Sequence, residues 1–260
     1  MTWASRRQFQ YFVGLVVFVG LVVFAFLYPI IFQKPTCFDS KQNGTETGVD
    51  CGGTCSLMCK ENIINPVVVW SRAFLVTGND FNLVSFIENR NKDSAVAEAS
   101  YEFRIYDTNN ILLGTRTGKT FIPPNQQFAI FEPRFSSGQS IIKTVTFEFL
   151  QPLIWVKKPP ILQTSQQSIN VSNIVFDNNK DTPSLSALVN NNSVRDIPEF
   201  DAIAILYDAN HNAINASKTH KDKLLNSTSV PIVFTWPELL PSEPVTKDII
   251  ILINPFLVSF

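Results

Sequence analysis

The feature that most constrains this chain is an uninterrupted apolar run near its N-terminus. Residues 11–32 read YFVGLVVFVGLVVFAFLYPIIF, which is 22 positions without a charged side chain. A helix of that length spans roughly 33 Å, close to the hydrocarbon core of a bilayer. A buried core helix would show a polar face, and a cleavable signal peptide would have a shorter apolar region followed by a small-residue cleavage site. The run therefore predicts a retained membrane-spanning helix.

Basic residues next to the run predict its orientation. Arg6 and Arg7 precede it, and the positive-inside rule places such residues in the cytoplasm. Two lysines soon after the run weaken this asymmetry. We expect residues 1–10 to be cytoplasmic, residues 11–32 to cross the cell membrane once, and the remainder to be extracytoplasmic.

All four cysteines lie in the segment that follows the run, residues 33–63. They are Cys37, Cys51, Cys55 and Cys59. Outside the cytoplasm cysteines usually form disulfides, and an even number permits complete pairing, although the spacing does not choose among three possible pairings. The C-x2-C pairs typical of zinc, iron–sulfur and thioredoxin-like sites are missing. We therefore expect a small segment held together by disulfides.

The same segment contains side chains that suit a calcium ion. Asp39, Asn43, Glu46 and Asp50 carry hard oxygen donors in a stretch rich in turn residues. Their spacing does not follow the EF-hand pattern. Calcium is therefore the one cofactor that the sequence leaves open, and we expect no other.

The cysteine segment also resembles a known motif. NGTETGVDCGGTC is similar to the NG-x-E-x-x-VDCGG-x-C motif of many secreted and cell-surface proteins, bacterial ones among them. The resemblance implies a surface location. It implies no chemistry, because the motif is attached to many unrelated modules.

From about residue 65 onward the pattern indicates β-strands only. In SYEFRIYD, Tyr101, Phe103 and Ile105 fall on one face while Glu102 and Arg104 fall on the other. Runs rich in Val, Ile, Phe and Thr alternate with Asn, Asp, Gly and Pro at short intervals. We find no later stretch with a convincing helical period, and so we predict an all-β fold for this region.

Two parts of this region match each other at an offset of 101 residues. ENRNKDSAVAEASYEFRIYDTNN and VNNNSVRDIPEFDAIAILYDANH align without a gap, pairing Asn89 with Asn190 and Asp107 with Asp208. The period is the size of one immunoglobulin-like sandwich. We predict two tandem antiparallel immunoglobulin-like sandwiches, residues 64–158 and 159–260. The join falls in a polar linker at residues 157–167.

The Tyr-Asp element carries a second resemblance. RIYDTNN and ILYDANH resemble the corresponding element of FxLyD domains and of late-embryogenesis-abundant type 2 sandwiches. This resemblance implies an antiparallel sandwich in a non-enzymatic envelope protein. For Asp107 and Asp208 themselves we expect a local role, in which each carboxylate caps a tight turn.

Motifs for catalysis are missing from the sequence. His211 and His220 fall in a predicted turn and a polar loop, outside any metal-ligand pattern. Nucleophile elbows, zinc-protease motifs and phosphate loops do not occur. With 21 basic and 22 acidic residues and no large basic cluster, nucleic-acid binding is disfavoured. We predict that the chain is not an enzyme.

Three functions remain at this point. The first is a membrane-anchored cell-surface structural or protein-interaction module, in which the apolar tail of residues 256–260 could dock to a partner. The second is an accessory subunit of a larger membrane or secretion assembly. The third is an extracytoplasmic carbohydrate-binding or hydrolytic protein. Five N-x-S/T sequons are also present, at Asn43, Asn170, Asn191, Asn215 and Asn226.

Overall fold

The structure is a computed structural model that describes residues 3–31, 36–150, 152–158, 168–178, 182–240 and 242–257. The chain divides into two compact units, Met1–Cys55 and Ser56–Phe260. Each unit is described by itself below.

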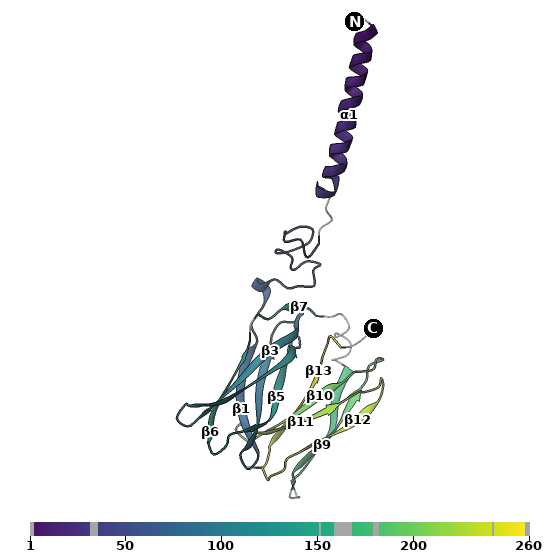
Figure 1. Cartoon of the computed structure of the whole chain (residues 1–260). Coiled ribbons are helices and arrows are strands. Elements are labelled where there is room, and N and C mark those ends of the chain that lie inside the picture. Colours follow the sequence, from purple (N-terminus) through teal and green to yellow (C-terminus); the bar gives the residue numbers. More distant parts are fainter. Residues whose placement is uncertain are drawn as a thin grey trace. The chain divides into compact units, whose positions relative to one another are not determined.

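The first unit begins with the predicted helix. Helix α1 (Trp3–Ile31) is the long coil at the N-terminus in Figure 1. It starts earlier than the apolar run, so that Arg6 and Arg7 are helical, and the Arg7 guanidinium lies 4.1 Å from the centroid of the Trp3 ring. Over Ser5–Tyr28 the helix is long and apolar enough to serve as a membrane span or as a signal sequence.

The second unit is built from antiparallel strands, preceded by a short 3-10 turn, η1 (Lys60–Asn62). The strands in the described residues are β1 (Val67–Thr77), β2 (Asp80–Asn89), β3 (Ser94–Asp107), β4 (Leu112–Ile122), β5 (Gln126–Ser136), β6 (Ile142–Phe149), β7 (Trp155–Lys157), β8 (Ile169–Asp177), β9 (Ser184–Asn191), β10 (Phe200–Tyr207), β11 (Ala213–Lys221), β12 (Ser229–Thr235) and β13 (Thr246–Ile253).

These strands form four sheets with a matching order in the two halves of the unit. Sheet I (β1-β2-β5) and sheet II (β4-β3-β6, with β7 beside β3) make up the first half. Sheet III (β11-β10-β13) and sheet IV (β8-β9-β12) make up the second. Strand for strand, sheet IV repeats the order of sheet I, and sheet III repeats that of sheet II. The prediction of an all-β, antiparallel sandwich architecture after an apolar helix is confirmed.

The first half buries the residues that alternation predicted. Tyr101, Phe103 and Ile105 of β3 are at most 5% exposed, in a core that sheets I and II share. On the opposite face, Arg104 forms ion pairs with Glu102 and with a glutamate of β6. The two-residue period of the sequence therefore fixes which face of β3 packs inward.

A third buried cluster joins the two halves, and the sequence analysis did not predict it. Sheet I contributes side chains from the face opposite to its own core, and sheet III does the same. The cluster, which we call the inter-sheet cluster, consists of Phe74, Val84, Ala129, Ile203, Ile205, Tyr207, Ala213 and Ala216. Burial here raises the pKa of Tyr207 to about 12. The sheets thus stack in the order II, I, III, IV, with sheets I and III buried on both faces.

Two predicted segment boundaries, the end of the cysteine segment and the start of the linker, both lie at strand β7. At the end of the cysteine segment, Met58 N–H donates to the Trp155 carbonyl at 2.9 Å, so the segment continues into pairing with β7. Lys157, the first residue of the predicted linker, is the last residue of β7. Residues 159–167 of that linker lie outside the described residues.

Candidate functional site

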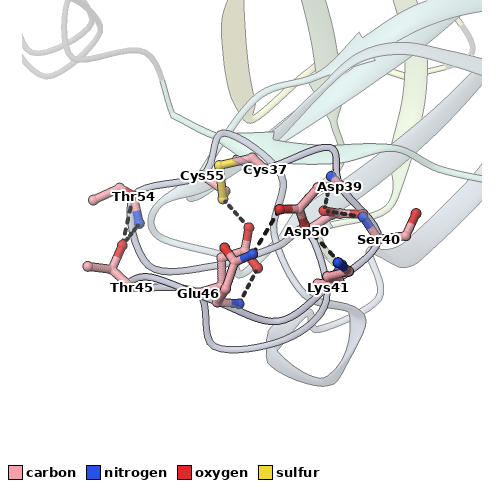
Figure 2. The surroundings of a disulfide bond; sticks show 10 residues. Cys37, Asp39, Ser40, Lys41, Thr45, Glu46, Asp50, Thr54 and Cys55 are labelled. Atoms are coloured by element: carbon pink, nitrogen blue, oxygen red, sulfur yellow. Dashed lines mark hydrogen bonds between the residues drawn. A yellow bond between two sulfur atoms is a disulfide. The ribbon is translucent and has the colours of Figure 1, made fainter. Parts of the chain in front are cut away.

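The cysteine segment folds as a disulfide loop. Cys37 and Cys55 are bonded across a Cα–Cα distance of 5.6 Å, as Figure 2 shows. Cys51 and Cys59 are disulfide-bonded as well, and the described residues include no free cysteine. The predicted disulfides are therefore confirmed, and the sulfurs are not available as thiolate ligands or nucleophiles.

Inside this loop Asp50 organises the backbone. Its Oδ1 accepts hydrogen bonds from the Asp39 N–H at 2.9 Å and the Ser40 N–H at 3.1 Å, and its Oδ2 accepts from Ser40 N–H at 2.9 Å (Figure 2). Ser40 and Asp50 both have left-handed backbones, with φ of 58° and 55°. A short loop has few apolar contacts, so its conformation depends on such hydrogen bonds together with the covalent bridge.

The second glycine of the DCGG motif has a steric reason. Gly53 has φ of 53°, and a Cβ at this position would lie 1.7 Å from the carbonyl oxygen of Thr45. No side chain fits there without moving the backbone. The glycine therefore permits two segments of the loop, around Thr45 and Gly53, to approach each other closely.

The four predicted calcium donors lie in this loop and bond to it. Asp39 Oδ2 accepts from Asn43 Nδ2 at 2.8 Å, which is the main cause of a lowered pKa for Asp39. Glu46 Oε2 accepts from the Asn43 N–H at 3.1 Å. The Asn43 Oδ1 atom is buried and has no hydrogen-bond partner in the part of the chain that the structure describes. Loop N–H and amide groups already bond these carboxylates, and calcium stays the untested alternative that the sequence left open.

A second group of potential metal ligands brings Glu46 next to the disulfide. Cys37, Glu46 and Cys55 offer atoms within 4.8 Å of one another, and Cys55 Sγ lies 3.3 Å from Glu46 Oε1. A disulfide sulfur has no hydrogen to donate and no negative charge, so we describe this as a packing contact. Of the three residues in this group, only Glu46 can therefore offer a charged ligand to a metal ion.

The two repeated aspartates cap equivalent turns, as the sequence predicted. Asp107 Oδ1 accepts from the N–H groups of Asn109 and Ile111, both at 2.8 Å. Asp208 Oδ1 accepts in the same way from the backbone two and four residues later, again at 2.8 Å. Hydrogen bonding to Asn212 is the largest cause of a lowered pKa for Asp208. Both carboxylates are therefore structural.

The predicted pairing of Asn89 with Asn190 is wrong by one residue. Asn89 is buried, donates from Nδ2 to the Pro123 carbonyl at 2.7 Å, and accepts the N–H of the residue two positions later. The residue that does this in the second half is Asn191, which donates to the Arg195 carbonyl at 2.7 Å. Asn190 instead bonds Asn170 on the outer face of sheet IV. The first half has one residue more than the second between this buried asparagine and the aspartate that caps the next turn. A gap-free alignment could not detect that difference.

One of the two histidines lies elsewhere than predicted. His211 is in the turn after β10, as expected, with φ of 59°. His220 was expected in a loop, but it belongs to strand β11, where Nδ1 lies 2.9 Å from Asp201 Oδ1. Lys218 Nζ approaches the same carboxylate at 3.4 Å. The alternation in KTH (residues 218–220), which puts Lys218 and His220 on the same face as an aspartate of the neighbouring strand, explains this arrangement.

The outer faces of sheets II and IV differ in charge. Sheet II carries the Glu102–Arg104 pair and a Lys119–Glu98 pair. On sheet IV, three neighbouring rows of outward residues carry no charge. These rows, which we call the uncharged face, are Val175–Ser186–Val233, Ser172–Leu188–Pro231 and Asn170–Asn190–Ser229. The alternation in SLSALVNN, with Ser, Ser, Leu and Asn at every second position, is the sequence signal for this face.

The sequons divide by accessibility. Asn191 and Asn215 are 1% and 8% exposed, so a glycan at either would conflict with the folded structure. Asn170 and Asn226 are exposed. The predicted docking tail is also only partly extended, because Leu257 N–H donates to the Asn254 carbonyl in a turn, and residues 258–260 lie outside the described residues.

Comparisons with known proteins give no family. No family model and no curated protein matches the chain. Among solved structures, a transglutaminase of red sea bream is 10% identical over 74% of this chain and 31% of that chain, with a TM-score of 0.23. A β-glucuronidase of glycoside hydrolase family 2 is 7% identical over 78% of this chain and 25% of that chain, with a TM-score of 0.21. A chain of a chaperone–tip adhesin complex of CFA/I fimbriae biogenesis is 12% identical over 64% of this chain and 94% of that chain, with a TM-score of 0.20. The chain spans about a third of the first of these proteins, and scores this low carry no argument.

Proposed function

We propose that this chain is a non-enzymatic, single-pass membrane protein whose β-unit lies outside the cytoplasm and contacts a protein partner. The observation that carries this proposal is helix α1, whose candidate span Ser5–Tyr28 is not buried against other described residues of the first unit. Apolar surface left in water costs about 25 cal/mol per Å², so a bilayer is the solvent that such a helix requires. Arg6 and Arg7 at its start favour a cytoplasmic N-terminus, and the disulfides favour an oxidising compartment for the rest.

The uncharged face supports a role in protein contact. Interface centres are depleted of charged residues relative to the remaining surface. Val175 and Val233 are 59% and 52% exposed at the end of this face, and hydroxyl and amide groups of its other rows can pair with a partner. A non-enzymatic role is supported by the carboxylates, since those of Asp107, Asp208 and Asp50 are engaged by backbone N–H groups of their own loops.

The test combines topology with partner recovery. In right-side-out membrane vesicles, external protease should remove a tag at residue 260 and leave a tag at residue 1 intact; the reverse result would contradict the orientation. A pull-down through the C-terminal tag, read by mass spectrometry, should recover a partner with the native chain and lose it with Val233→Glu. The matched control is Thr117→Glu on the exposed β4 strand of sheet II.

The outcome also separates this function from the related one of an accessory subunit. A membrane partner recovered at near-equal abundance, with recovery unchanged by Val233→Glu, would make the chain a subunit that binds through another surface. Recovery lost equally with Val233→Glu and Thr117→Glu would point to a general folding effect and would overturn the uncharged face as the contact.

A further inference from the structure

A cleft separates the two halves of the second unit where strands β1, β2 and β5 face β11 and the end of β12. It holds 250 Å³, and a neighbouring hollow of 170 Å³ shares several wall residues with it, including Leu75, Trp236 and Pro237. Ligand sites occur preferentially at such interfaces between packed domains. Three features of the wall indicate what this cleft could bind.

The first feature is an unused hydrogen-bond donor. Trp236 is 3% exposed and its ring contacts Phe176 in a T-shaped arrangement. Its Nε1–H is buried and finds no acceptor within the described part of the chain. An indole can only donate, and a buried donor without a partner is costly and rare. Trp236, which lines the cleft, therefore also belongs to the core of the second half and carries a buried N–H without an acceptor there.

The second feature is a strained and unpaired arginine. Arg134 has φ of 54°, a conformation that is costly for any residue with a side chain. Its N–H donates to Asn82 Oδ1 at 3.3 Å, and its carbonyl accepts from Arg116 Nη2 at 3.4 Å. Arg134 is exposed and lines the cleft, and among the described residues no carboxylate forms an ion pair with its guanidinium. A guanidinium in this position can bind a carboxylate in a bidentate manner.

The third feature is the rest of the lining of the larger cavity. Leu75, Phe131, Pro133 and Pro237 give it an apolar wall, and Lys218 adds a second cation, which Asp201 partly neutralises at 3.4 Å. We propose that this cleft binds a small amphipathic carboxylate. Arg134 binds the carboxylate, and the apolar part of the ligand packs against Phe131 and the two prolines.

The proposal is tested by calorimetric titration of the full chain in lipid nanodiscs with N-acetylphenylalanine, its neutral amide being the matched ligand. Empty nanodiscs correct for partition into lipid. We expect the acid to bind and Arg134→Gln to weaken it by about tenfold or more, as the loss of a charge-assisted pair requires. Lys119→Gln, on the exposed β4 strand, should bind like the native chain.

A second variant separates binding from stability. Arg134→Gly relieves the left-handed strain, so it should raise the melting temperature while it lowers affinity as Arg134→Gln does. Equal binding of acid and amide, native affinity in Arg134→Gln, or no binding up to about 10 mM acid would each overturn the proposal.

Discussion

At the scale of single residues, Asn191 and its neighbour Asn190 provide a direct test of the second sandwich. Asn191→Ala removes the acceptor of the buried Ser193 N–H and a buried amide that donates to the Arg195 carbonyl. We expect a loss of about 1–3 kcal/mol in the free energy of unfolding, because a buried polar group left without its partner pays its full desolvation cost. Asn190→Ala removes bonds at a solvent-accessible site and should cost less than about 1 kcal/mol. Urea denaturation measures both, and equal losses would contradict the register described above.

Gly53 and Gly78 form a second matched pair. Both have left-handed backbones, but a Cβ would clash only at Gly53, since nothing lies within 4 Å of one at Gly78. Gly78→Ala should therefore cost about 1 kcal/mol from backbone strain alone. Gly53→Ala should prevent the native loop, so that a maleimide reagent labels Cys37 and Cys55 in protein recovered from the membrane. Fully oxidised Gly53→Ala protein would show that the loop tolerates the displacement.

The turn at Asp208 predicts a dependence on pH. Hydrogen bonds from Asn212 lower the pKa of this carboxyl below its usual 3.8. A carboxyl with a lowered folded-state pKa contributes stability above its unfolded pKa and loses that contribution as pH falls through the folded value. The gap in melting temperature between the native chain and Asp208→Ala should be full at pH 6 and should shrink below about pH 4. A gap that stays constant down to pH 2 would exclude this carboxylate as its source.

At the scale of elements, the sequence predicts faces better than it predicts neighbours. Alternation in β3 identified Tyr101, Phe103 and Ile105 as core because one face of that strand meets water. The same rule could not assign β10, whose FDAIAILY is apolar at both parities, because this strand is buried on both faces. Such a run signals a covered sheet, but the identity of the covering sheet depends on contacts between residues more than 100 positions apart.

The disulfide loop illustrates the same limit for the candidate site. The sequence predicted oxidised cysteines and oxygen donors around them, and it did not reveal that Asp50 and Glu46 would be used by N–H groups of the loop. We expect that adding about 2 mM calcium, above the roughly 10⁻⁴–10⁻³ M dissociation constants of extracellular calcium modules, or EDTA leaves the melting temperature unchanged. A rise with calcium that Asp50→Asn abolishes would instead establish the calcium site that the sequence left open.

At the scale of the whole β-unit, the inter-sheet cluster makes the two halves depend on each other. Sheets I and III each lose a covered face if the halves separate, which exposes Phe74, Ile203 and Ile205 at once. The outer face of sheet II carries ion pairs, so the stack ends there, much as polar capping repeats end a solenoid. Two sandwiches joined by an apolar face of this kind should not behave as independent domains on a linker.

This arrangement predicts a single unfolding transition for the second unit by scanning calorimetry. Ile203→Ala should lower the whole transition by several degrees, since emptying a fully buried site of this size costs about 2–5 kcal/mol. Val233→Ala, at a position 52% exposed on the uncharged face, should stay within about 0.5 kcal/mol of the native chain. Two separate transitions, of which Ile203→Ala moves only one, would mean that the halves unfold independently and that their contact contributes little to stability.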